Sequence, residues 1–344
     1  MIDYNQADIL ESELLDTFGT EVFQRLLRDH STYAKQKEMG AKEDDCHIVW
    51  GTSDYADRGE GFGEKDQITI EKVTGDNSHI IMPRSVKSRE QQRARTQERA
   101  EVFTPSWLCN AQNNLIDEAW FGHPNPFNTT DEELHTWTST KSPIRFPKGK
   151  TWQDYVAEPR LEITCGEAPY LVSRYDSVSG NIIPISERIG LLDRKMRIVR
   201  ENCPTVEDWL PAARKALQSI YGYEWQGDSL LLARENIFVS MIEYYKDAFG
   251  TESCPPDKEI LMWAYIIGWN LFQMDGLKMV VPMSCHDIAN PFSELFGEPP
   301  EPCPGCLHNK KHDHNGIYAL IREWPPMGNN GNGKKKRFID LIKW

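Results

Sequence analysis

Two short apolar runs in the chain end at a glycine or an acidic residue and lead directly into a helix-like segment. They are LEITCGEAPYLV (161–172) and SIYGYEWQGDSLLLAREN (219–236), and a third run, IIGWNLFQMDGL (266–277), ends at Asp275 and Gly276. Short strands that alternate with helices are typical of α/β domains with a mostly parallel sheet, in which ligands bind beyond the carboxyl ends of the strands. The pattern therefore predicts an α/β core, with a candidate ligand site at the residues that follow the strands.

The residue types at these strand ends indicate a nucleotide-like ligand. Cys165-Gly166 forms a small-residue turn, which lets backbone N–H groups approach a ligand closely. Glu224 ends the second run, where an acidic residue typically bonds ribose hydroxyls, although a carboxylate that begins a helix is also favoured by the helix dipole. Asp275 can accept a bond from an adenine amino group, or it can simply close a turn.

Three segments, taken in order, resemble the adenine-specific DNA methyltransferases of restriction-modification systems, which use S-adenosylmethionine. EVFTP (101–105) is similar to the segment that folds over the methionine part of the cofactor. ITCGEAPYL (163–171) resembles the acidic-Pro-x-Cys-Gly-x-Gly-x-Phe-Leu loop under the cofactor, with Ile163 in place of Pro and Ala168 in place of the second Gly. GYEWQGDSLLLAREN (222–236) resembles the strand with the ribose-binding carboxylate. The resemblance implies a Rossmann-like methyltransferase core whose cofactor-binding residues are Glu101, Phe103, Thr104, Pro105, Glu162, Cys165, Gly166, Glu224 and Asp275.

The catalytic tetrad of that family, Asn/Asp-Pro-Pro-aromatic, has no complete counterpart in this chain. In the family its oxygens hold the target amino group, and its ring stacks on a flipped base. The nearest candidate is Asn290, Pro291 and Phe292 in DIANPF, which lacks one Pro. Two functions remain open: a DNA methyltransferase acting on the exocyclic amine of adenine, or a non-catalytic methyltransferase-like subunit that binds cofactor or DNA and supports a separate catalytic chain. A third alternative, from the residues alone, is a nuclease-like metal site assembled from Asp54, Asp66, Glu71 and Lys87.

Cysteines and histidines gather near the C-terminus in CPGCLHNKKHDHNG (303–316). Cys303 and Cys306 form a C-x-x-C turn, which can place two thiolates on one face of a metal ion. His312 and His314 are the predicted further ligands of a zinc site, and Cys285 is an alternative. Four protein ligands leave no open position for water, so such a zinc ion is expected to be structural.

The charge balance limits where nucleic acid can bind. The formal net charge of −13 opposes phosphate binding over the whole surface. The candidate nucleic-acid contacts are therefore two local basic stretches, although the first can equally be a solvated helix face with salt bridges: Arg84, Lys87, Arg89, Arg93 and Arg95 (extending to Arg99), and Lys335 and Arg337 near the C-terminus.

The order of these patterns suggests three regions. Residues 1–97 are expected to form a small α+β region, with amphipathic helices over 9–37 and short strands over 48–82. Residues 98–283 are expected to form the cofactor-binding core, and residues 284–344 a Cys/His-rich loop with a β-hairpin. No apolar run is long enough to span a membrane and the N-terminus lacks the pattern of a signal peptide, so we expect a cytoplasmic protein whose partners are DNA and, for a partial enzyme, a second subunit.

Overall fold

The computed structural model describes residues 2–87, 92, 96, 104–131, 133–289, 299–327 and 331–342. These residues form a mixed α/β fold with 11 α-helices and three small sheets. The helices before the central sheet are α1 (Glu11–Phe18), α2 (Thr20–Leu27), α3 (His30–Gln36), α4 (Ile70–Val73), α6 (Ser106–Phe121) and α7 (Trp152–Ala157). The remaining helices are α8 (Leu191–Asn202), α9 (Val206–Gln218), α10 (Gly227–Phe249), α11 (Asp257–Asn270) and α13 (Pro304–His308).

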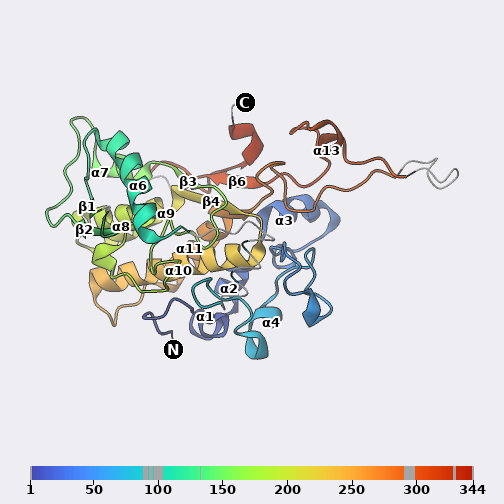
Figure 1. The fold of residues 1–344 in the computed structure, drawn as a ribbon, viewed down its shortest axis with the longest axis horizontal. Coiled ribbons are helices and arrows are strands. Elements are labelled where there is room, and N and C mark those ends of the chain that lie inside the picture. Colours follow the sequence, from blue (N-terminus) through green and yellow to red (C-terminus); the bar gives the residue numbers. More distant parts are fainter. Residues whose placement is uncertain are drawn as a thin grey trace.

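The central sheet consists of three parallel strands in the order β3-β4-β5 (Figure 1). The strand β3 (Arg160–Glu162) pairs with β4 (Ile220–Glu224), which pairs in turn with β5 (Leu271–Gln273). In this register Glu162 lies opposite Gly222, and Glu224 lies opposite Gln273. The carboxyl ends of the strands therefore meet at one edge, as the sequence predicts, although the described residues do not form a complete Rossmann sheet.

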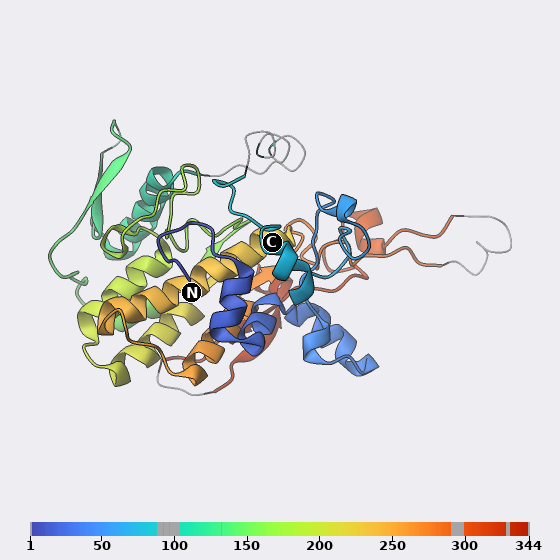
Figure 2. The ribbon, with the colours of Figure 1, turned by 90° about the horizontal axis from the view of Figure 1, so that it is seen from below.

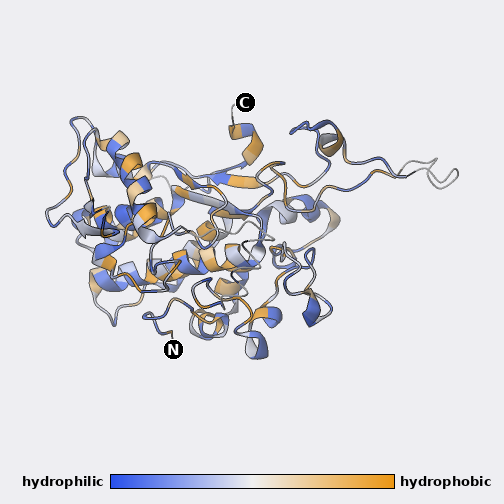
Figure 3. Ribbon diagram, viewed as in Figure 1, coloured by the Kyte–Doolittle hydropathy of each residue, from blue (hydrophilic) through white to orange (hydrophobic). Residues whose placement is uncertain are grey.

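Helix α10 lies at the centre of the main hydrophobic core (Figure 2) and is buried from Gly227 to Tyr245. Its Arg234 is fully buried, which is costly unless each N–H group finds an acceptor. All of these groups donate to backbone carbonyl oxygens, namely those of Leu26, Arg28, Gly268 and Leu271. One side chain thus ties the N-terminal helices and β5 to α10. Many helices carry hydrophobic and hydrophilic residues side by side (Figure 3), as expected of helices with one buried face.

The N-terminal helices occur as predicted, but the short strands expected over 48–82 do not form. Ile48, Trp50 and Ile68 are fully buried and extended, yet the only ladder contact between their segments is a single bridge between Val49 and Gln67. The helix α4 occupies part of the run predicted as a strand. Around this bridge the N–H of Ile68 donates to the carbonyl oxygen of Ile48 (2.9 Å), and a bond from the N–H of Ile48 to the carbonyl oxygen of Leu27 (2.9 Å) joins the segment to the end of α2.

The third predicted strand is shorter than expected because α11 continues to Asn270. At Gly268 this helix packs so closely on α2 that an added Cβ would lie 2.7 Å from the carbonyl oxygen of Arg25. The predicted C-terminal hairpin is confirmed: β6 (Leu320–Glu323) pairs antiparallel with β7 (Lys334–Arg337). A further hairpin, β1 (Asn128–Asp131) with β2 (Thr136–Ser139), follows α6 and was not predicted.

Candidate functional site

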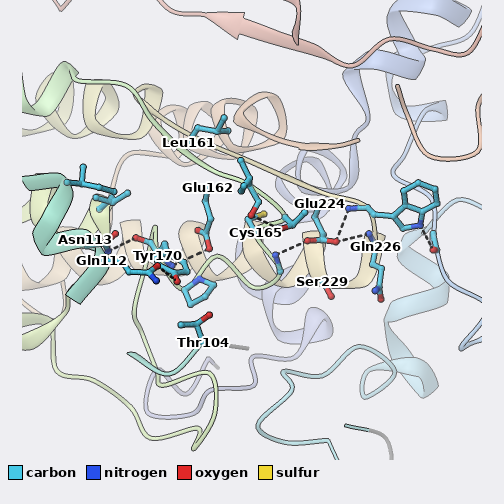
Figure 4. A pocket seen from close by; sticks show the side chains of 18 residues that line it. Thr104, Gln112, Asn113, Leu161, Glu162, Cys165, Tyr170, Glu224, Gln226 and Ser229 are labelled. Atoms are coloured by element: carbon cyan, nitrogen blue, oxygen red, sulfur yellow. Dashed lines mark hydrogen bonds between the residues drawn. The ribbon is translucent and has the colours of Figure 1, made fainter. Parts of the chain in front are cut away.

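A cavity of about 800 Å³ opens at the carboxyl ends of β3 and β4 (Figure 4). This volume lies within the range of small-molecule sites, about 300–1,000 Å³. Five of the predicted cofactor-binding residues line the cavity, although they come from segments up to 120 positions apart in the chain: Thr104, Glu162, Cys165, Gly166 and Glu224. The residues that the sequence pattern places at the strand ends therefore lie around one cavity in the structure.

The loop after β3 shapes the floor of this cavity through its backbone. Thr164, Gly166 and Ala168 have positive φ values of 45, 52 and 62°, so left-handed residues alternate along the loop. The N–H groups of this loop bond within the protein: that of Cys165 donates to the carbonyl oxygen of Tyr223 (2.9 Å), and that of Ala168 to the carbonyl oxygen of Cys165 (2.7 Å). Ala168, which stands where the related loop has its second glycine, is fully buried in the conformation that glycine favours. The departure from the family pattern is thus accommodated at the cost of local strain.

Glu224 lies in the wall of the cavity with its carboxylate held by three backbone N–H groups. Gly166 donates to Oε2 (2.9 Å), while Trp225 and Gln226 donate to Oε1 (2.8 and 3.2 Å). Burial raises the pKa of this carboxyl, and the three donors oppose that rise by stabilising the charged form. A carboxylate offers about four acceptor sites, so Oε2 keeps the capacity for a further donor such as a hydroxyl group.

Glu162 provides a second acidic group in the same cavity. Its oxygens accept only long bonds from the N–H groups of Tyr170 (3.4 Å) and Leu171 (3.2 Å). Burial raises the pKa of Glu162 well above its ordinary value, and the nearby charge of Glu224 raises it further. The two carboxyl groups offer oxygen acceptors to a ligand with several hydroxyl or amino donors, and a positive charge on the ligand would offset the repulsion between them.

Several residues in the cavity wall were not predicted from the sequence. Gln112 and Asn113 lie on α6, and Gln112 accepts a hydrogen bond from the Tyr170 hydroxyl (2.6 Å). The run NAQNN (110–114) is unusually rich in amides for a helix and was the only signal for them. Gly51 and Trp225 form another part of the wall, and no local pattern marks Gly51, which arrives from the N-terminal region.

Other predicted cofactor-binding residues lie elsewhere. Asp275 does not line the cavity, because its carboxylate closes a turn by accepting from the N–H groups of Leu277 (2.9 Å) and Lys278 (3.1 Å). Pro105 precedes α6 as its N-cap residue. The remaining predictions, Glu101 and Phe103 for the cofactor and Asn290, Pro291 and Phe292 for catalysis, lie outside the described residues.

A second candidate site is formed by three cysteines and one histidine that lie before, within and after α13. Cys285, Cys303, Cys306 and His314 each offer one ligand atom, and these atoms lie within 4.8 Å of one another. The three Sγ atoms lie 3.5, 3.7 and 3.6 Å from Nδ1 of His314. One ring nitrogen cannot form three hydrogen bonds along its single lone-pair direction, whereas a shared metal ion explains three equal separations. This group can bind a metal ion such as zinc.

The geometry corrects one predicted ligand. His312 is exposed and lies outside the group, whereas Cys285 contributes the fourth ligand atom. The segment around Cys285 is held in place by the Ser284 hydroxyl, which accepts from the N–H of Ile317 (2.9 Å). The N–H of Asn315 donates to Sγ of Cys303 (3.3 Å). Although burial opposes it, donation from Asn315 and Cys306 lowers the pKa of the Cys303 thiol to about 6, which favours the thiolate form that metals bind.

Nucleic-acid binding by the basic residues stays a prediction, and the structure shows where the described ones lie. Lys87 is buried, Lys335 lies over the ring of Trp269 (5.3 Å), and Arg337 pairs with Asp340 (2.8 Å). The backbone N–H of Arg84 donates to Glu167 (2.7 Å). Arg89, Arg93, Arg95 and Arg99 lie outside the described residues. No group that includes Asp54, Asp66 and Glu71 gathers in the described part of the chain, where the carboxylate of Asp66 instead accepts from the N–H of Gly63 (2.8 Å).

Comparison with protein-family models, with curated proteins and with solved structures finds no match for this chain. Among the described helices, none combines the length and the apolar character needed to cross a bilayer.

Proposed function

We propose that the chain is an S-adenosylmethionine-dependent methyltransferase component that acts on the exocyclic amine of adenine in DNA. One observation carries the proposal: the segments that resemble the cofactor motifs of that family meet around a single cavity at the carboxyl ends of parallel strands. Parallel strands alone bring Glu162 and Glu224 together, but Thr104 reaches the same cavity from a separate segment that precedes α6.

The residues of the cavity suit this cofactor in charge and in hydrogen bonding. Glu224 would accept from the ribose hydroxyls, and Glu162 from the positively charged amino-acid part. Gly166 has a positive φ of 52° and no side chain, so the loop backbone can approach the ligand closely. When bound, S-adenosylmethionine supplies an electrophilic methyl group. The protein's contribution would be to exclude water and to fix the orientation of the acceptor amine.

We further propose that the Cys/His group holds a structural zinc ion. Zinc–sulfur bonds of about 2.3 Å and a zinc–nitrogen bond of about 2.0 Å at the tetrahedral angle place sulfur and nitrogen about 3.5 Å apart. The observed separations of 3.5, 3.7 and 3.6 Å fit this value. Four protein ligands fill the coordination sphere, so the ion would stabilise the chain around α13 and take no part in catalysis.

A second candidate function is a non-catalytic subunit that supports a separate catalytic chain. It is favoured by the outer edge of β3, with which no strand pairs in the described part of the chain. Leu161 and Ile163 lie at this edge, are 44 and 63% exposed, and line the mouth of the cavity. A strand of the catalytic partner that paired with β3 would cover both side chains and bring its own residues to the cavity.

A transfer assay separates the two functions. The purified chain is incubated with labelled S-adenosylmethionine and unmethylated DNA, alone and with the product of the neighbouring gene. Transfer by the chain alone supports the enzyme, whereas cofactor binding with transfer only in the presence of the partner supports the subunit. An Asn290→Ala variant tests the predicted catalytic residue, since full transfer by this variant would refute its role.

Cofactor binding has its own control pair. Glu224→Gln should weaken binding of S-adenosylmethionine, whereas Glu259→Gln, which alters a buried carboxylate paired with Arg214 outside the cavity, should not. If the wild-type chain binds no S-adenosylmethionine, both forms of the proposal that depend on this cofactor are wrong.

A further inference from the structure

The N-terminal segment around Val49 is joined to the strand ends by the side chain of Gln273. Gln273 ends β5 and is fully buried. Its Oε1 accepts from the N–H of Val49 (2.8 Å), and its Nε2 donates to the carbonyl oxygens of Val49 (2.8 Å) and Trp225 (2.8 Å). The carboxamide thus pairs with the backbone of Val49 much as a neighbouring strand would, although 224 positions separate the two residues.

Close backbone packing leaves this segment little freedom to shift. The indole N–H of Trp225 donates to the carbonyl oxygen of Gly51 (2.8 Å), and the N–H of Gly227 donates to that of Trp50 (2.8 Å). Gly51 has a φ of 68°, and a Cβ atom there would lie 2.6 Å from the carbonyl oxygen of Trp225. A Cβ atom at Gly227 would overlap the carbonyl oxygen of Val49. The segment therefore fits only at the position that Gln273 defines.

The residues that Gln273 holds are part of the cavity, but Gln273 itself is not. Gly51 and Trp225 line the cavity, whereas Gln273 lies behind them. Trp225 also connects the carboxamide to the acidic group, because its N–H donates to Glu224 (2.8 Å) while its carbonyl oxygen accepts from Gln273. Loss of the carboxamide would free one wall of the cavity and the backbone that orients the Glu224 carboxylate.

We infer that Gln273 is a positioning residue that fixes the N-terminal wall of the cavity, and that residues 48–51 are thereby an integral part of the ligand site. The ligand class rests on the proposed function: S-adenosylmethionine is the compound whose affinity should depend on this wall. The positioning role of Gln273 follows from its contacts and does not depend on which ligand binds.

The test uses two variants that remove equivalent buried amides. Gln273→Met keeps the length of the side chain but removes its three hydrogen bonds. Asn270→Leu is the matched control: Asn270 is also fully buried, donates to the carbonyl oxygens of Leu217 (3.1 Å) and Ile220 (2.8 Å), and accepts from the indole N–H of Trp324 (2.7 Å). It lies at the start of β5, at the opposite end of the strand from the cavity.

Two measurements on the full chain are compared at a temperature where both variants are folded. Calorimetric titration should show the Kd for S-adenosylmethionine raised by about tenfold or more in Gln273→Met and unchanged in Asn270→Leu. Hydrogen exchange should be faster at the N–H groups of Val49, Gly51 and Gly227 in Gln273→Met alone. A purely structural role of Gln273 would lower the Tm of both variants without separating them in affinity.

The outcomes also distinguish this inference from the proposed function. If the wild-type chain binds no S-adenosylmethionine, the proposed function fails. Hydrogen exchange alone then tests whether Gln273 fixes residues 48–51. Unchanged exchange at Val49 and Gly51 in Gln273→Met would overturn the inference. So would accelerated exchange accompanied by wild-type affinity, because the wall would then have no influence on the ligand.

Discussion

The metal centre yields a sharp prediction, since the sequence pattern predicts both His312 and His314 as ligands, whereas the structure places only His314 in the group. We compare His314→Ala with His312→Ala in the full chain. Nδ1 of His314 lies 3.5–3.7 Å from three thiol sulfurs, whereas His312 is exposed and outside the group. The wild-type chain and His312→Ala should each bind one zinc ion per chain, and His314→Ala should lose it or bind it far more weakly.

The effect on stability follows from the position of the group. Cys285 lies between β5 and α13, and His314 precedes β6, so the ion would join two segments that flank the second hydrophobic cluster, which includes Phe272, Met279 and Ala319. A metal held at a free concentration about 1,000 times its Kd stabilises the folded state by about 4 kcal/mol. The shift of Tm per kcal/mol falls with chain length, to about 1.4 °C for a chain of 344 residues, so removal of the metal should lower the Tm by roughly 5–6 °C.

The assay combines metal analysis with thermal unfolding in the presence and absence of a chelator. X-ray absorption should show about three sulfur atoms at about 2.3 Å and one nitrogen at about 2.0 Å. The chelator should lower the Tm of the wild type and of His312→Ala, but not that of His314→Ala. Retention of zinc by His314→Ala together with its loss from His312→Ala would refute the reasoning, as would a wild-type chain that binds no zinc.

Three further substitutions test the packing and the buried charges. Gly227→Ala should destabilise the fold by about 3 kcal/mol in denaturant unfolding, because the added Cβ overlaps the carbonyl oxygen of Val49. Burial raises the pKa of Glu235 and Glu11 well above the ordinary carboxyl value, so stability present at pH below about 4.5 is lost as the pH rises through the folded-state values. Glu235→Gln should therefore flatten the fall of Tm as the pH rises above about 4.5, and it should stabilise the chain relative to the wild type at alkaline pH. Ala168→Gly should change stability by less than about 1 kcal/mol, because relief of the left-handed strain offsets the loss of a buried methyl group.

The two substitutions that change a methyl group each have a control that separates the stated cause from a general effect. Gly122→Ala adds a Cβ with no atom within 4 Å, so it should cost only the strain of a φ of 76°, about 1 kcal/mol. Ala233→Gly in α10 removes an equally buried methyl group from a right-handed helix and should cost about 2 kcal/mol. A Glu235→Gln variant with an unchanged pH profile, or an Ala168→Gly variant as damaging as Ala233→Gly, would contradict the argument.

The part of the cavity that could be predicted from the sequence is the part built by local patterns. Glu162, Gly166 and Glu224 follow apolar runs directly, and parallel strands bring their carboxyl ends together. Asp275 follows the same rule, but its carboxylate is used within its own turn. An acidic residue after a strand is therefore a candidate ligand group only where the nearby backbone leaves it acceptor capacity.

The contacts that could not be predicted join residues far apart in the chain. Gly51 lines the cavity next to a backbone segment that the side chain of Gln273, 222 positions later, holds by its bond to Val49. A single buried amide of this kind has no sequence signature. The sequence pattern predicts His312 and His314 as ligands with Cys285 as an alternative, whereas the bond between Ser284 and Ile317 brings Cys285 to the group. The strands expected over 48–82 were wrong for a related reason: the alternating apolar pattern reports an extended, buried segment, but it does not report whether a second strand pairs with it.

The strand order bears on the choice between a complete enzyme and a subunit. Parallel α/β sheets bind ligands where the order of the strands reverses, because the flanking crossovers diverge there and leave a crevice. The described order β3-β4-β5 runs in one direction, yet the cavity lies at β3, the outermost strand. A strand added beyond β3 would create the reversal at the cavity and cover Leu161 and Ile163, which are exposed there. Substituting Ile163 with Asp should then abolish partner-dependent transfer. Retained transfer in this variant would favour a chain that is catalytically complete by itself.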